Sequence, residues 1–397
     1  MSISSAQTPQ RYAVTALDLA LRPDFDAGGL LALMRSLAAA RDLPVHGAMT
    51  PLLPAGDLRR ARCVVFILID GLGDDYLLAQ AAPNLLRYRR GHLSSVFPSA
   101  TASAVTTLFT GEAPGRHGIT GWFTHIAAAG GIVRPLPLDR RGGGGAVQPA
   151  AVFATAPLFA RDAVPQVLLN PAPIADSPYS RWHMPAARRV GYDSLATFFG
   201  RLAELARGDA RFIHAYFPGL DSLAHEAGIG SAAAAELLAQ IDAGFAWTIE
   251  TLRGQDVAIV LSADHGFIDT TPERAIDLAA YPDIAACLAA PLSGEPRIAY
   301  CRLVEEKRTG FAAAVSEQLG HAFHLLDPDQ LITAGWFGPP PFHSELRDRL
   351  GDAVLLARDN YVLHDWLATE KPYFHRGVHG GISRSEMFVP LIYVPPS

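Results

Sequence analysis

Four short apolar runs along the chain have the pattern of buried β-strands. They are CVVFILI at 63–69, RFIHAYF at 211–217, DVAIVLS at 256–262 and MFVPLIYV at 387–394. Each run is rich in β-branched or aromatic residues and lacks a clean alternation of polar and apolar positions, which is typical of parallel strands covered on both faces. The pattern therefore predicts four buried, parallel strands.

Helical segments lie between these runs. Residues 29–42 (GLLALMRSLAAARD) and 231–254 (SAAAAELLAQIDAGFAWTIETLRG) are long and rich in alanine and leucine. Strands that alternate with helices predict an α/β fold with a doubly wound, mostly parallel sheet and helices on both faces. The segment 271–355 carries proline clusters such as GPPPF, and we expect it to form a smaller inserted cap. The α/β domain would then comprise residues 1–270 and 356–397.

Composition narrows the classes of function. The chain has 397 residues, 18% of them charged, and a formal net charge of -6, which argues against disorder and against a basic nucleic-acid-binding surface. Its three cysteines show no paired spacing that would indicate disulfides or a zinc ribbon. The N-terminus has no basic start followed by an apolar run, and no apolar stretch is long enough to span a bilayer. We therefore expect a cytoplasmic protein without membrane or nucleic-acid partners.

Acidic residues follow three of the predicted strands. Asp70 ends the run FILIDG, Asp221 and His225 lie in HAYFPGLDSLAHEAG, and Asp264 and His265 lie in VLSADHGFID. Ligands of open α/β sheets bind beyond the carboxyl ends of the strands. We therefore expect these five side chains to converge on one crevice.

Each of these residues taken alone has a structural explanation. Asp70 could end its strand in a turn, Asp221 could cap a helix, and Asp264 with His265 could form a hydrogen-bonded turn. Taken together, three clustered carboxylates would repel one another unless cations lay between them. The combination therefore favours a metal site.

The residue types and their spacing fit divalent metal ions. Asp and neutral His bind zinc and similar ions, and Asp221 and His225 lie one helical turn apart, so both can bind the same ion. A further histidine is needed to complete two three-ligand sites. The C-terminal segment HRGVHGGIS offers His375 and His379, the second of which is followed by two glycines.

The order of these residues resembles that of the alkaline-phosphatase superfamily, and within it the nucleotide pyrophosphatase/phosphodiesterase branch and phosphonoacetate hydrolase. The superfamily order is a strand-end Asp, a Thr or Ser nucleophile, Asp-x-x-x-His, Asp-His and a late His. Three further segments resemble sequence motifs of the family. APNLLRYRRG resembles its TPNL helix, and TTLFTGEAPGRHGITG resembles its TLxTGxxPxxHGI motif. VHGGISRSEMFVPLI resembles its C-terminal HGG…E…VP motif. The seven positions here are Asp70, Thr101, Asp221, His225, Asp264, His265 and His379.

This resemblance implies two divalent metal ions as cofactors. Zinc is the favoured ion, and manganese or iron would accept the same ligands. One ion would be bound by Asp221, His225 and His379. The other would be bound by Asp70, Asp264, His265 and the hydroxyl of Thr101.

The hydroxyl-rich segment SVFPSATASAVTTLFTG at 95–111 aligns with the family's nucleophile segment, in a register that makes Thr101 the nucleophile. A helix is expected to begin near Thr101, because Pro98 and Ser99 precede an alanine-rich run. Its free N–H groups would bind a phosphoryl group, with the backbone amide of Ala102 as a candidate donor. Without the carboxylates, Thr101 would be interpreted as a plain helix N-cap. Ser99 and Ser103 are alternative nucleophiles outside this register.

Two further expectations concern the same helix. Its later threonines, Thr106, Thr107 and Thr110, are expected to bond to backbone carbonyls. The resemblance places a phosphate-binding asparagine where this chain has Ala104. Side chains that could replace it are Trp122, Tyr216, Arg181 and His183.

The resemblance implies a metal-dependent hydrolase of phosphodiester or nucleotide pyrophosphate bonds. It would act on small-molecule phosphoryl substrates through a covalent intermediate on Thr101. One alternative is a phosphonate hydrolase that cleaves carbon–phosphorus bonds, as phosphonoacetate hydrolase does, because the glycines after His379 resemble that branch. Another alternative is a metal-binding relic without catalytic activity. A sulfatase is disfavoured, because no cysteine lies near residue 101.

Overall fold

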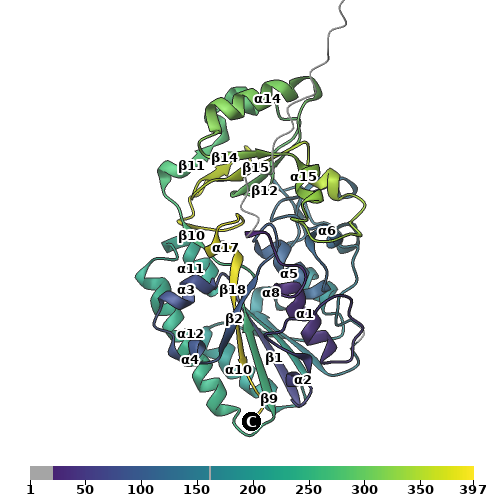
Figure 1. Ribbon diagram of the computed structural model, residues 1–397, viewed down its shortest axis with the longest axis vertical. Coiled ribbons are helices and arrows are strands. Elements are labelled where there is room, and N and C mark those ends of the chain that lie inside the picture. Colours follow the sequence, from purple (N-terminus) through teal and green to yellow (C-terminus); the bar gives the residue numbers. More distant parts are fainter. Residues whose placement is uncertain (1–20, 161) are drawn as a thin grey trace, which may run out of the picture.

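The computed structural model describes residues 21–160 and 162–397, and a seven-stranded sheet forms its centre (Figure 1). The strand order is β2-β18-β9-β1-β8-β6-β7. The five adjacent strands β9, β1, β8, β6 and β7 are parallel to one another. The strands are β1 (Cys63–Ile69), β2 (Arg89–Ser94), β6 (Gln166–Pro171), β7 (Arg188–Tyr192), β8 (Phe212–Phe217), β9 (Val257–Ser262) and β18 (Phe388–Val394). The predicted α/β fold with a mostly parallel sheet is confirmed.

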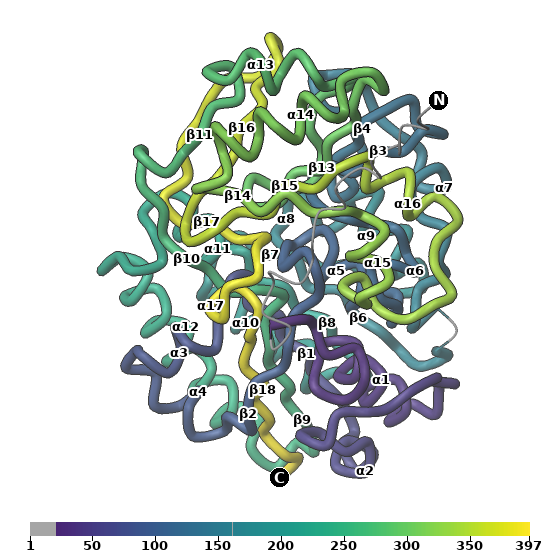
Figure 2. The backbone as a smooth tube through the Cα atoms, turned by 45° about the horizontal axis from the view of Figure 1, so that its top comes forward, coloured from purple at the N-terminus to yellow at the C-terminus, as the bar shows by residue number. Residues whose placement is uncertain are grey.

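The direction of β18 differs from the prediction. It pairs antiparallel with both β9 and β2, so the expectation of a parallel strand at 387–394 is wrong. The chain enters β18 directly from the short helix α17 (Arg384–Met387), which lies at the carboxyl edge of the parallel strands. From that edge the chain can only run back, since a parallel strand needs a crossover connection. The C-terminus accordingly lies beside the far end of β9 (Figure 2).

Helices cover both faces of the sheet, as predicted. Helix α1 (Leu30–Ala39) packs on α5 (Thr101–Thr110) on one face. On the other face α12 (Ala232–Thr251) packs on α10 (Leu195–Arg207) and α4 (Pro83–Arg87), and Figure 1 shows the two groups on opposite sides of the strands. Every residue of β1 is consequently buried. The apolar runs lack alternation because neither face of the sheet meets water.

The remaining α-helices of the described residues are short, with at most nine residues each. They are α2 (Ala55–Leu58), α3 (Asp74–Ala79), α6 (Pro114–His117), α7 (Pro149–Val152), α8 (Ala172–Ala175), α9 (Pro178–His183), α11 (Gly219–Ala227), α13 (Pro282–Ala285), α14 (Arg308–Ala314), α15 (Pro328–Thr333) and α16 (Leu346–Arg349). In the described part of the chain, no helix is both long and apolar enough to cross a membrane.

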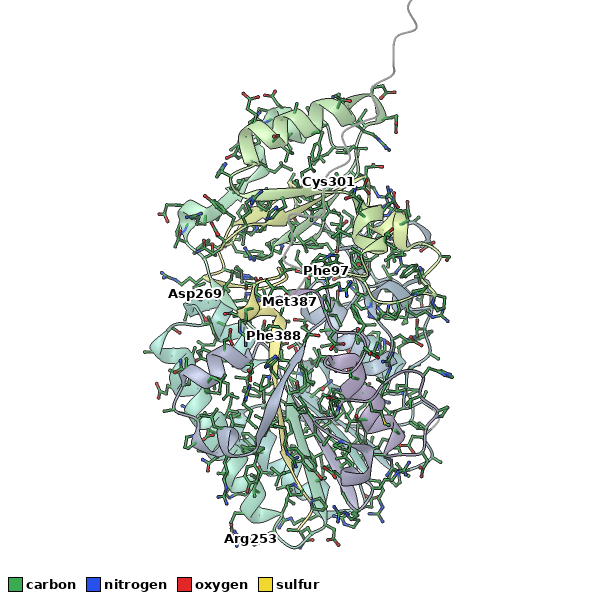
Figure 3. The ribbon with its side chains drawn as sticks, in the orientation of Figure 1. Phe97, Arg253, Asp269, Cys301, Met387 and Phe388 are labelled. Carbon is green, nitrogen blue, oxygen red and sulfur yellow. The ribbon has the colours of Figure 1, made fainter. Side chains whose placement is uncertain are left out.

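A second, antiparallel sheet lies above the carboxyl end of the central one. Its order is β12-β13-β15-β14, with the bounds Ser293–Glu295, Ile298–Cys301, Ala353–Ala357 and Phe323–Leu326. It has an apolar core of its own with α14, which includes Phe311. A further apolar cluster joins Phe97, at the junction in Figure 3, to Trp336, with ring centroids 5.1 Å apart. We propose that this sheet and its helices are the cap expected at 271–355.

Small two- and three-stranded sheets join the cap to the rest of the molecule. Strands β3 (Thr124–Ile126), β4 (Gly131–Arg134) and β5 (Asp139–Arg140) form one such sheet. Strand β11 (Ala275–Asp277) pairs with β16 (Val362–His364), and β10 (Ile268–Asp269) pairs with β17 (Gly377–Val378). Phe123, just before β3, forms a backbone bridge to Gly294 of β12. These links place the cap directly over the carboxyl edge of the central sheet.

Candidate active site

Three carboxylates meet at the carboxyl edge of the central sheet. Asp70 directly follows β1, Asp264 lies just beyond β9, and Asp221 lies in the first turn of α11, which follows β8. Because β1 lies between β8 and β9, the three side chains come from adjacent strands. Asp70 and Asp264 are almost fully buried. The convergence expected from the sequence is present.

His265 lies at the centre of the cluster. Its Nε2 atom is 3.4 Å from a carboxylate oxygen of Asp70 and 3.4 Å from one of Asp264. The Thr101 hydroxyl oxygen lies 3.0 Å from the same Nε2. The His265 ring stacks on His379 with centroids 3.7 Å apart. One imidazole nitrogen is therefore within reach of two carboxylates and the hydroxyl.

Asp221 faces two further histidines. Its Oδ1 atom lies 3.3 Å from His225 Nε2 and 3.8 Å from His379 Nε2. Burial by itself would lower the pKa of His225, but the contact with Asp221 raises it. Burial and the neighbouring imidazoles hold the pKa of His379 well below its ordinary value. His375 lies behind His225, with ring centroids 4.2 Å apart.

The other ring nitrogen of each histidine has a backbone partner. A carbonyl oxygen only accepts, so Nδ1 carries the proton and Nε2 presents its lone pair to the carboxylates. This second hydrogen bond is what fixes the orientation of metal-binding histidines. The pairs are His225 with the Gly377 carbonyl at 2.9 Å, His265 with Gly266 at 3.1 Å, and His379 with Ser99 at 3.2 Å.

The carboxylate oxygens that face these nitrogens lack hydrogen-bond partners within the described ranges. They are Asp70 Oδ1, Asp221 Oδ1 and Asp264 Oδ2, all buried. Burial, together with the neighbouring carboxylates, raises the pKa of Asp70 and of Asp264. Unsatisfied buried oxygens opposite imidazole lone pairs fit divalent cations, which would compensate both the charge and the missing bonds.

Two groups of ligand atoms are compact enough to hold an ion each. Within each group the atoms lie within 4.8 Å of one another. One group is Asp221, His265 and His379, and the other is Asp70, Asp264 and His265. The described residues therefore contain two candidate metal-binding clusters that share His265. His225 borders the first cluster through its contact with Asp221.

Thr101 is the first residue of α5, and Ala100 occupies the N-cap position without a side-chain hydrogen bond. The first intrahelical bond runs from Ala104 N to the Ala100 carbonyl. The N–H groups of Ala102 and Ser103 therefore precede the hydrogen-bonded ladder and are free to bind an anion. The helix begins where the sequence predicts, and Thr101 is not its N-cap.

The later threonines of α5 only partly follow the prediction. Thr110 donates to the Thr106 carbonyl at 2.7 Å, as expected. Thr107 instead bonds to His117 Nε2 at 3.0 Å, and the Thr106 hydroxyl pairs with that of Tyr179 at 3.0 Å. The prediction of backbone partners is wrong for these two, because both face buried polar groups of neighbouring helices.

Position 104 does not supply a phosphate donor. Ala104 is fully buried in the hydrophobic core, and its methyl group offers no hydrogen-bond donor. Of the proposed replacements, Arg181 is exposed and pairs with Asp176 at 3.0 Å. His183 is buried, with Nδ1 3.1 Å from the Tyr179 carbonyl. Neither of these two residues is in contact with the clustered carboxylates.

Tyr216 has a different role from the one expected. Its hydroxyl donates to Asp70 Oδ2, the oxygen turned away from His265. This bond occupies one oxygen of the carboxylate and leaves Oδ1 facing the cluster. Tyr216 lies in β8, directly beside β1. Its position as the penultimate residue of a strand next to β1 is the only sequence signal for this role.

A buried ion pair holds the loop that carries His379. Arg297, in the cap, donates through Nε and Nη2 to Glu386 at 3.0 and 3.1 Å. Glu386 also accepts the N–H of Gly381 at 2.8 Å, and Ser99 donates its hydroxyl to the Gly381 carbonyl at 2.8 Å. Glu386 belongs to a motif noted in the sequence, whereas Arg297 was not identified. The cap therefore supports one of the candidate metal ligands.

The sequence matches the family of type I phosphodiesterases and nucleotide pyrophosphatases over residues 64–131 and 147–382. The chain belongs to this family. The resemblance inferred from the ordered Asp, Thr and His positions is thereby confirmed. Membership in this phosphodiesterase family indicates a hydrolase of the phosphodiester or phosphonate type. The matched ranges include every residue of the two candidate metal-binding clusters.

Solved structures share the fold of this family member. Murine ectonucleotide pyrophosphatase/phosphodiesterase 5 is 18% identical, with a TM-score of 0.66 over 84% of this chain and 88% of that one. The human protein of the same name is 16% identical, with a TM-score of 0.64 over 83% and 87%. Phosphonoacetate hydrolase from Sinorhizobium meliloti, in complex with phosphonoformate, is 17% identical, with a TM-score of 0.61 over 84% and 90%. A search of curated proteins found no match.

Proposed function

We propose that the protein is a two-metal hydrolase that cleaves phosphodiester or nucleotide pyrophosphate bonds of small molecules through a covalent intermediate on Thr101. The observation that carries this proposal is the position of the Thr101 hydroxyl. It lies at the start of a helix and 3.0 Å from Nε2 of His265, the residue shared by both candidate metal clusters. This arrangement supports a proposed nucleophile, an anion-binding helix end and a cation site at one point.

The chain offers a ligand set for each ion. In the proposal, one ion is held by Asp221, His225 and His379, and the other by Asp70, Asp264, His265 and the Thr101 hydroxyl. Zinc suits these ligands, and manganese or iron would accept them too. When bound, such ions supply positive charge that lowers the pKa of a hydroxyl and neutralises phosphoryl oxygens.

The residues of the chain then carry the two steps. The Thr101 oxygen attacks phosphorus and forms an ester bond, while the bond to the leaving oxygen breaks and that oxygen takes up a proton. The backbone N–H of Ala102 donates to a phosphoryl oxygen at the helix terminus. A water molecule then attacks the threonyl phosphoester, which returns the proton and restores the hydroxyl. Tyr216 keeps Asp70 oriented throughout.

A substrate panel tests this proposal. We expect zinc- or manganese-loaded protein to release p-nitrophenol from bis-p-nitrophenyl phosphate, or a nucleoside monophosphate from a dinucleotide pyrophosphate. The Thr101→Ala variant is the matched control, because it keeps the six side-chain ligands and should retain metal. Turnover of phosphonoacetate alone would favour the carbon–phosphorus hydrolase, which the glycines after His379 suggest. Metal binding without turnover of any substrate would favour the alternative of a metal-binding relic that has no catalytic activity.

A further inference from the structure

Phe267 lies among the histidines of the candidate active site. Its ring is only 3% exposed and packs edge-to-face against three imidazoles. The ring centroids lie 5.1 Å from His225, 5.6 Å from His265 and 5.1 Å from His379, with interplanar angles of 76°, 61° and 73°. Aromatic rings at such separations and angles attract one another. One phenyl ring therefore contacts histidines from both of the proposed ligand sets.

Two glycines leave the space that this ring occupies. Gly71 directly follows Asp70, and a β-carbon there would lie 2.4 Å from Phe267 Cε2. The carbonyl of Gly377 accepts the Nδ1–H of His225, and a β-carbon at this glycine would lie 3.1 Å from Phe267 Cδ1. The ring is therefore enclosed by candidate metal ligands and by residues that follow or orient them.

Strand pairing fixes the ring relative to the segment that carries His379. Phe267 immediately precedes β10, which pairs antiparallel with β17 through Ile268 and Val378. Val378 is the last residue of β17, so His379 directly follows this pairing. Figure 2 shows β10 and β17 side by side, next to α11. The small sheet thus joins the segment of His265 to that of His379, with Phe267 at the junction.

The hydrogen bonds of the three imidazoles fix only one point of each ring. Each ring is held at Nδ1 by one backbone carbonyl, and it can still tilt about that contact. A tilt displaces Nε2, the atom that faces the carboxylates, whereas metal–ligand distances tolerate only about 0.2 Å. A side chain packed against the imidazoles removes this freedom, because close-packed interiors resist displacement.

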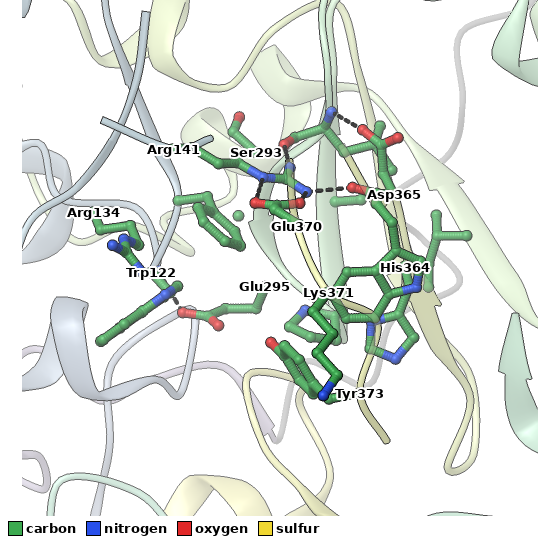
Figure 4. A pocket seen from close by; sticks show the side chains of 17 residues that line it. Trp122, Arg134, Arg141, Ser293, Glu295, His364, Asp365, Glu370, Lys371 and Tyr373 are labelled. Atoms are coloured by element: carbon green, nitrogen blue, oxygen red, sulfur yellow. Dashed lines mark hydrogen bonds and ion pairs between the residues drawn. The ribbon is translucent and has the colours of Figure 1, made fainter. Parts of the chain in front are cut away.

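The other aromatic neighbours of these histidines are more exposed. His375 packs beside His225, with ring centroids 4.2 Å apart, and Tyr373 lies 4.4 Å from His375. Tyr373 is 50% exposed and lines a pocket of about 250 Å³ (Figure 4). Water reaches this wall, so the buried constraint on the imidazoles comes from Phe267.

We propose that Phe267 is a positioning residue for both metal sites. Its ring sets the relative tilt of the imidazoles of His225, His265 and His379, so that their Nε2 atoms face the clustered carboxylates before any ion binds. The inference rests on the metal-binding part of the proposed function. It adds a residue that neither binds metal nor touches substrate.

Replacement by leucine tests this role on the full chain. Phe267→Leu keeps an apolar side chain but cannot fill the space between the imidazoles. We expect the affinity for zinc, titrated calorimetrically into metal-free protein, to fall about tenfold at each site. Cobalt bound in place of zinc should show a changed visible absorption spectrum, because the ligand geometry differs.

The matched control is Phe245→Leu. Phe245 is also buried in the central core, where it packs edge-to-face on Tyr88 with ring centroids 6.3 Å apart. This variant removes the same atoms from the core and should lower the Tm. Its zinc affinity and cobalt spectrum should stay as in the wild type, because the Phe245 ring packs on none of the candidate ligands that the structure describes.

A milder variant keeps the test decisive if Phe267→Leu does not fold. Methionine is flexible and fills irregular gaps, so Phe267→Met should bind zinc more weakly than the wild type but more tightly than Phe267→Leu. Wild-type zinc affinity and an unchanged cobalt spectrum in every Phe267 variant that folds, or an equal loss in Phe245→Leu, overturns the positioning role. A wild type that binds no zinc rejects both proposals. The expected losses, found together with no turnover of any substrate, would support the positioning role and reject the proposed hydrolase instead.

Discussion

Replacing Arg297 by methionine should destabilise the protein and loosen the loop that carries His379. The guanidinium makes two parallel bonds to Glu386, at 3.0 and 3.1 Å, and the two side chains are 2% and 0% exposed. Methionine preserves much of the apolar stem but leaves the buried carboxylate without its cation. The variant also loses the bond from Arg297 Nη1 to the Tyr361 carbonyl at 2.7 Å, so the effect is on charge and hydrogen bonding rather than on apolar packing.

The expected loss of unfolding free energy depends on the hydrogen bonds that Glu386 keeps in the variant. Removing one partner of a buried ion pair costs about 3–5 kcal/mol. Glu386 still accepts N–H groups from Gly381 at 2.8 Å and Ser383 at 3.2 Å, so we expect the lower end, about 3 kcal/mol. In a chain of this size that corresponds to a fall in Tm of about 3–6 °C. Affinity for metal should fall about tenfold, because the support of His379 is weakened.

Calorimetry with zinc and with chelator measures both effects. Arg347→Met is a matched control, since the Arg347–Asp329 pair is exposed and should contribute less than about 1 kcal/mol. The double variant Arg297→Met with Glu386→Gln should recover part of the loss, because no buried charge remains. An unfolding free energy of Arg297→Met within about 1 kcal/mol of the wild-type value at neutral pH would refute the reasoning.

The same pair predicts a pH dependence. Burial alone would raise the pKa of Glu386, but Arg297 holds it below its ordinary value of 4.5. A carboxyl whose pKa is lower in the folded state contributes stability above its unfolded pKa and loses it as the pH falls through the folded value. In Arg297→Met burial alone should raise the pKa of Glu386 above 4.5, so the stability gap between wild type and variant should begin to narrow above that pH and continue to narrow down to the folded pKa of the wild type. A gap that stays constant on acidification would contradict this account.

Three other predictions concern the proposed active site. Thr101→Ala should abolish turnover but retain metal, and Thr101→Ser should keep part of the rate; wild-type turnover by Thr101→Ala would exclude this nucleophile. Asp264→Asn should lose one ion yet stabilise the chelated protein at neutral pH. Because the pKa of Asp264 is raised in the folded state, this carboxyl stabilises the fold below its ordinary pKa of 3.8, and that stabilisation is lost as the pH rises through the folded pKa. Calorimetry and metal analysis measure the two effects. A chelated Asp264→Asn variant that is less stable than chelated wild type would contradict the prediction. The protein should prefer bis-p-nitrophenyl phosphate to p-nitrophenyl phosphate, because no Arg or Lys lies between Ser94 and Gly115 to bind a further anionic oxygen. A higher kcat/KM for the monoester would reject that prediction.

The sequence alone determined the fold class and the residues that meet at the site. Continuous apolar runs identify strands buried on both faces, and such strands form only in a sheet covered by helices. Asp70 and Asp264 lie one and two residues beyond these runs, so the geometry of a parallel sheet brings them to one edge. Pro98 and the alanines after it likewise indicate a helix that begins at Thr101.

The tertiary structure alone decided which partners the buried polar groups find. Arg297 and Glu386 are 89 positions apart, and Tyr216 and Asp70 are 146 positions apart, so no local pattern joins them. The direction of β18 depends on where the chain re-enters the sheet, which its own composition does not encode. Glu295 has the sequence context of an ordinary strand residue, and its burial comes from packing against the distant segment at Trp122. Local periodicity reports which side of an element is buried, whereas hydrogen-bond and charge partners are set by packing between distant segments.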